Sequence, residues 1–141
     1  MDQKNSYANE VSKVYEIINQ IKNDLENEED MNVRSTKGIK KIIAKYALIL
    51  VEVKQIESYF NRLDSPFCFV HEHQFMLKAL SEYVKATEDI VAAIKVESRV
   101  FTEEPYLIAF KKQNNATEKI SKIAKLLFNL PDNWQEIKKP L

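Results

Sequence analysis

The side chains best suited to chemistry lie together near the middle of the chain, in the segment Cys-Phe-Val-His-Glu-His from Cys68 to His73. Imidazole and carboxylate groups are common metal ligands. On a helix, however, His71 and His73 point about 160° apart, because successive side chains are separated by about 100° around the axis. The two imidazoles therefore cannot share one ion, and we expect no metal site at this pair.

Other catalytic and cofactor patterns in this segment are incomplete. Cys68 and His71 lie one turn apart, but the chain has a single Gly and so offers no Gly-rich turn to supply oxyanion donors. His73 and Met76 lie on one helix without a haem attachment motif, and Cys68 and Val70 stand where a di-iron bundle needs Glu. The sequence therefore predicts no enzymatic activity and no cofactor, and we expect His73 to be a core histidine bonded to a backbone carbonyl or a Tyr hydroxyl.

Composition indicates one folded, helical domain over residues 1–141. The chain has 21 Lys+Arg and 21 Asp+Glu, 45% hydrophobic residues, one Gly and four Pro. So few turn residues favour helices, and zero net charge gives no reason to expect a nucleic-acid partner. The longest apolar run, residues 46–51, is too short to span a membrane, and the single Cys excludes an internal disulfide.

Apolar residues at steps of three and four predict helices over residues 5–27 and 36–63. The first stripe is Tyr7, Val11, Val14, Ile18, Ile21 and Leu25, and the second is Ile39, Ile42, Tyr46, Ile49, Val53, Ile56, Phe60 and Leu63. We expect the first helix to end near Asn27, because the acidic run over residues 26–30 opposes the negative end of the helix dipole. The acidic run is therefore predicted to be a loop.

Two further helices are predicted over residues 66–99 and 103–129. Asp64 or Ser65 can cap the third helix, with Pro66 in its first turn, and Pro105 serves similarly in the fourth. The polar stretch from Lys111 to Asn115 leaves open whether the fourth helix is continuous. Because Trp134 presents a large apolar surface, we expect the C-terminal tail to pack on one end of the bundle.

Four amphipathic helices with short links predict an all-α, up-down-up-down four-helix bundle. This topology gathers most of the aromatic residues, and both His, at one end. The candidate pocket or interface residues there are Phe60, Phe67, Phe69, His73, Phe75 and Trp134. They form either a site for a small ligand or partner side chain, or a plug of wide rings that closes the splayed end.

Pro66, His73, Ala79 and Tyr83 follow one another at spacings of 7, 6 and 4. This pattern resembles a helix of small helical-bundle proteins, many of them lipoproteins, from low-GC Gram-positive bacteria such as bacilli. The resemblance implies a helical bundle with a structural core histidine and no assigned biochemical role. Two features depart from the pattern: no lipobox cysteine precedes Tyr7, and an aromatic-rich triplet replaces the charged residues expected after Pro66.

The sequence favours a non-enzymatic bundle that acts through protein–protein interaction or self-association. The alternative is a carrier of a small hydrophobic ligand at the aromatic end. Two locations also stay open: the cytoplasm, if Met1 is the native start, and the cell envelope through a lipid anchor, if an N-terminal segment was removed.

Overall fold

The computed structural model describes the backbone of residues 3–32, 36–96 and 104–128, and side chains within 6–24, 41, 43–67, 69–93 and 107–127. Four helices follow in order: α1 (Gln3–Asn32), α2 (Thr36–Arg62), α3 (Val70–Val96) and α4 (Glu104–Phe128). A short 3₁₀ turn, η1 (Phe67–Phe69), precedes α3. These ranges hold no strand, and the predicted all-α bundle is confirmed.

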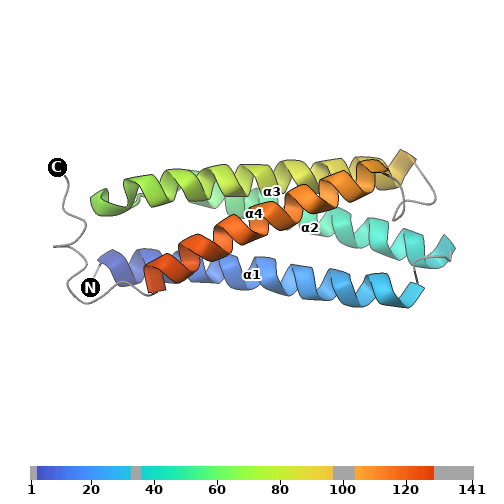
Figure 1. Ribbon diagram of the computed structural model, residues 1–141, viewed down its shortest axis with the longest axis horizontal. Helices are drawn as coiled ribbons and strands as arrows, with labels where there is room; N and C mark the ends of the chain where they lie inside the picture. Colours follow the sequence, from blue (N-terminus) through green and yellow to red (C-terminus); the bar gives the residue numbers. More distant parts are fainter. Residues whose placement is uncertain (1–2, 33–35, 97–103, 129–141) are drawn as a thin grey trace.

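Successive helices run in opposite directions and pack around a common core (Figure 1). The helix α1 packs against α2 and α4, and α3 packs against the same two helices. Figure 1 shows that α4 runs obliquely, beginning beside α3 and ending beside α1.

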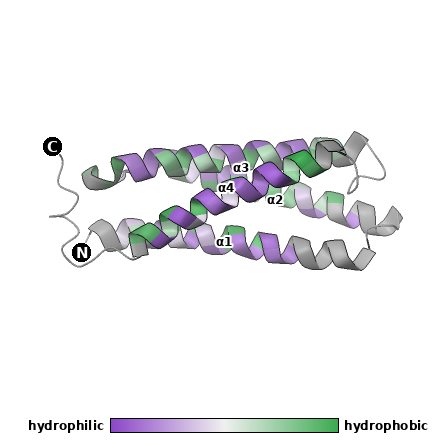
Figure 2. Cartoon of the chain, viewed as in Figure 1, coloured by the Kyte–Doolittle hydropathy of each residue, from purple (hydrophilic) through white to green (hydrophobic). Residues whose placement is uncertain are grey.

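The core is built from the apolar stripes that the spacing predicts. Hydrophilic and hydrophobic residues alternate along the helices in Figure 2, as expected for amphipathic helices. The largest fully buried side chains are Tyr46, Tyr83, Phe60, Phe69, Ile18, Met76, Leu80, Ile90, Ile120 and Leu127. In the described part of the chain, no helix has the length and hydropathy needed to cross a bilayer.

The predicted end of the first helix near Asn27 is wrong, because α1 continues to Asn32. The acidic run over residues 26–30 is therefore helical rather than a loop. Glu is a good helix former, and like-charge pairs on a helix cost only about 0.2–0.5 kcal/mol each. Repulsion of this size does not stop a helix that is already propagating.

The entry to α3 also differs from the prediction. Pro66 is the extended N-cap of η1, with φ −56° and ψ 146°, and the Phe69 N–H donates to its carbonyl at 2.9 Å. No side-chain hydrogen bond caps this turn, so the expected cap from Asp64 or Ser65 is absent there. The helix α4, by contrast, is continuous through Lys111 to Asn115, and the predicted packing of the tail lies outside the described residues.

Candidate functional site

A buried histidine joins three helices at the aromatic end of the bundle. His73, on α3, is 8% exposed, and its Nδ1 lies 2.8 Å from the hydroxyl of Tyr7 on α1. The ring also makes a hydrogen bond to the backbone of Phe60 on α2. Which partner donates in the Tyr7–His73 bond depends on which ring nitrogen carries the proton.

This environment favours the neutral form of both partners. Burial lowers the pKa of His73, although the hydrogen bond to the Phe60 backbone opposes that shift. Burial and the nearby Glu72 carboxylate both raise the pKa of Tyr7. His73 is therefore a buried, largely neutral histidine that links α3 to Tyr7 of α1.

Aromatic rings pack around this link. The Tyr7 and Phe69 rings are stacked with centroids 5.7 Å apart, and the rings of Phe60 and His73 are stacked at 6.0 Å. Tyr59 lies beside Phe60 and also bonds through its hydroxyl to Glu10 of α1, which raises the pKa of Tyr59. The buried rings therefore fill the interior of this end with one another.

The structure divides the predicted aromatic set into two groups. Phe60, Phe69 and His73 come together in the interior, whereas Phe67 is 71% exposed and Phe75 is 45% exposed. The side chain of Cys68 and all of Trp134 lie outside the described residues. Within the described residues, no cluster of three or more His, Cys, Asp or Glu side chains is arranged to hold a metal ion.

A second polar cluster lies between α3 and α4, where sequence reasoning placed only a polar stretch. The buried Gln113 amide donates to the Thr87 hydroxyl at 3.0 Å, and Thr87 donates to the Tyr83 carbonyl at 2.8 Å. On the same pair of helices, Lys119 bonds to Glu82 at 2.7 Å. The sequence did carry one sign of this cluster, because Gln113 falls between Ala109 and Ala116 in the spacing of the residues that α4 buries.

The outer face of α2 is a further feature that the sequence reasoning missed. Leu48 and Val51 are 72% and 57% exposed, on the side of α2 that faces away from the core. Other exposed residues extend this face along the helix without adding a charge. We call this set the α2 outer face: Ala44, Ala47, Leu48, Val51, Gln55, Ser58 and Tyr59.

Comparison of the chain with protein-family models, with curated proteins and with solved structures finds no match.

Proposed function

We propose that this chain is a non-enzymatic binding module that docks an amphipathic helix of a partner protein on the α2 outer face. The observation that carries this proposal is the exposure of Leu48 and Val51 in the middle of a surface that contains no charged side chain. Ala44 and Tyr59 lie 15 positions apart on the helix, which is about 22 Å at about 1.5 Å per residue. That length matches about four turns of a partner helix.

The position of this surface separates it from the other exposed apolar side chains. The α2 outer face lies along the middle of a helix whose neighbours, α1 and α3, are both described. Leu107 and Ile108 are the first residues of α4 whose side chains are described, and Leu126 is next to the last, so both sites adjoin residues whose side chains the structure does not describe. The α2 outer face differs from them in that the residues before and after it along α2 are described.

The charges beside this surface favour a particular partner chemistry. Lys41, Lys54 and Arg62 are exposed along its edges and ends, against two carboxylates: the exposed Glu52, and Glu10, which accepts from the Tyr59 hydroxyl. A partner helix that carries carboxylates beside its apolar stripe would complement this net positive charge. A second copy of α2 would bring the same cations together, and like charges at an interface disfavour association. The charge pattern therefore favours a different protein over self-association.

The test is site-specific photo-crosslinking in the source cells. A photoreactive phenylalanine analogue replaces Leu48 in one variant and Val51 in another, and the matched control carries it at Glu88, an exposed position on α3. Mass spectrometry then identifies the crosslinked peptides. We expect adducts at positions 48 and 51 to map to one partner segment with helical apolar spacing and flanking acids.

A follow-up measurement ties any adduct to the α2 outer face. The identified segment is made as a synthetic peptide, and the double variant Leu48→Ser with Val51→Ser should weaken its binding at least tenfold. Adducts formed with another copy of this chain would overturn the proposal in favour of self-association. The proposal would also be overturned if the probe at position 88 gave as many adducts as the probes at positions 48 and 51, or if those two probes gave none.

A further inference from the structure

We propose that the groove between α3 and α4 is a binding site for a small organic anion bearing phosphate or carboxylate groups. The groove is open to solvent and has a volume of about 380 Å³. Ser81, Glu82, Lys85 and Ala86 line it from α3, and Lys112, Asn115 and Lys119 line it from α4. Its volume falls within the range of about 300–1,000 Å³ that is usual for small-molecule sites.

Short side chains on α3 keep the groove hollow. Ser81 and Ala86 are the short side chains of the lining on α3, and Ala86 is buried. Next to it, the hydrogen bond between Gln113 and Thr87 joins the two helices. The groove is therefore fixed by the packing of the bundle, and a ligand would bind without first ordering a loop.

The charges of the lining decide the class of ligand. Three lysines face one glutamate in the groove, and Lys119 already bonds to Glu82 at 2.7 Å. This ion pair neutralises the charges at the end of the groove where Lys119 meets Glu82. The carboxylate of Asp89, 3.3 Å from the Lys85 ammonium, offsets part of its charge, and Lys112 adds a further cation at that end. The end of the groove at Lys85 and Lys112 therefore keeps a positive excess.

A ligand that fits this arrangement has an anionic group at one end and a partly apolar body, because most of the exposed lining of the groove is apolar. Lysine ammonium groups bind phosphate and carboxylate oxygens as point charges. The Ser81 hydroxyl and the Asn115 amide lie in the same lining and can hydrogen-bond the rest of the molecule. This site is independent of the α2 outer face, because α2 contributes no residue to the groove.

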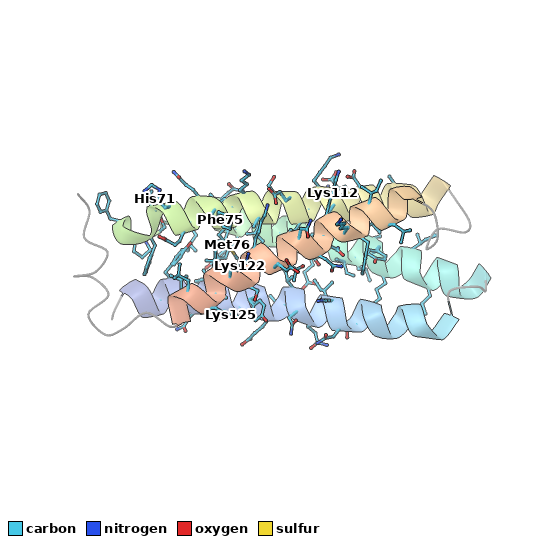
Figure 3. All side chains as sticks on the ribbon, viewed as in Figure 1. His71, Phe75, Met76, Lys112, Lys122 and Lys125 are labelled. Atoms are coloured by element: carbon cyan, nitrogen blue, oxygen red, sulfur yellow. The ribbon has the colours of Figure 1, made fainter. Side chains whose placement is uncertain are left out.

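The chain provides a matched control for the lysines. Figure 3 shows Lys112 on the half of α4 that runs beside α3, with Lys122 and Lys125 on the other half. Neither Lys122 nor Lys125 lines the groove, and both are exposed. The double variant Lys122→Gln with Lys125→Gln therefore removes the same charge as Lys85→Gln with Lys112→Gln without altering the groove.

The test is a titration of the ¹⁵N-labelled full chain, followed by amide chemical shifts at constant ionic strength. Pyrophosphate is the probe for phosphate groups, and citrate is the probe for carboxylates. We expect saturable shifts confined to residues 81–86 and 112–119. The groove variant should weaken binding of the effective probe at least tenfold, whereas the control variant should change it less than twofold.

The two probes distinguish the sources of the anionic group. Saturation by pyrophosphate alone assigns a phosphate-bearing ligand, and saturation by citrate alone assigns a carboxylate-bearing one. The proposal is overturned if neither probe saturates, or if the groove and control variants weaken binding equally. Unchanged circular dichroism and melting of both variants show that lost binding is not lost folding.

Discussion

Removing the Tyr7 hydroxyl should destabilise the bundle by about 1–3 kcal/mol, because it leaves a buried ring nitrogen of His73 without its hydrogen-bond partner. Tyr7 is 3% exposed and its hydroxyl lies 2.8 Å from Nδ1 of His73. The variant Tyr7→Phe keeps the ring and its stacking on Phe69, so the change isolates the hydrogen bond. For a domain of this size, 1 kcal/mol corresponds to a fall in Tm of about 3–4 °C.

The assay is urea unfolding of the wild-type chain and the variant, followed by far-ultraviolet circular dichroism. The matched control is Tyr15→Phe, the same chemical change on a half-buried tyrosine of the same helix, for which we expect less than about 0.5 kcal/mol. A double-mutant cycle with His73→Leu should give a coupling energy of about 1 kcal/mol between the two side chains. A Tyr7→Phe midpoint equal to that of Tyr15→Phe, with no coupling, would refute the structural role of this bond.

Three further predictions concern stability. Because burial lowers the pKa of His73, the unfolded chain binds a proton at this histidine at a higher pH than the folded chain does. The free energy of unfolding should therefore fall as pH drops below about 6.5 and level off below the folded-state pKa. Urea midpoints should fall less with pH in the variant His73→Gln, and as much as in the wild type in His71→Gln, which changes an exposed position. Thr87→Val removes the acceptor of the buried Gln113 amide and should destabilise the chain by about 1–3 kcal/mol in the same urea assay, with little change in shape. Leu80→Ala leaves a cavity in a fully buried position and should cost about 2–5 kcal/mol, measured as a fall in Tm.

Much of the fold could be predicted because helical spacing is a local property. The apolar stripes from Tyr7 to Ile21 and from Tyr46 to Phe60 contain most of the buried residues of α1 and α2. The end of α1 could not be placed in the same way. A helix ends where small and opposing backbone and side-chain energies balance, and in α1 the helix propensity of Glu outweighs the repulsion within the acidic run.

The candidate sites were less predictable because they depend on how the helices pack. The spacing placed His73 on a core stripe, but only the antiparallel packing of α1 against its neighbours brings the Tyr7 hydroxyl to it. Likewise, the groove is lined by residues of both α3 and α4, and no periodicity along one helix encodes which residues of another lie beside it. The α2 outer face did leave a signal in the apolar run over residues 46–51, which is too long for one face of a helix.

The most direct test of the proposed binding function is the ratio of crosslinked adducts at position 48 to those at position 88 in the source cells. We predict a ratio well above one at position 48, with the adducts on a single acidic, amphipathic helix of another protein. A ratio near one, or adducts only with this chain itself, would contradict the account.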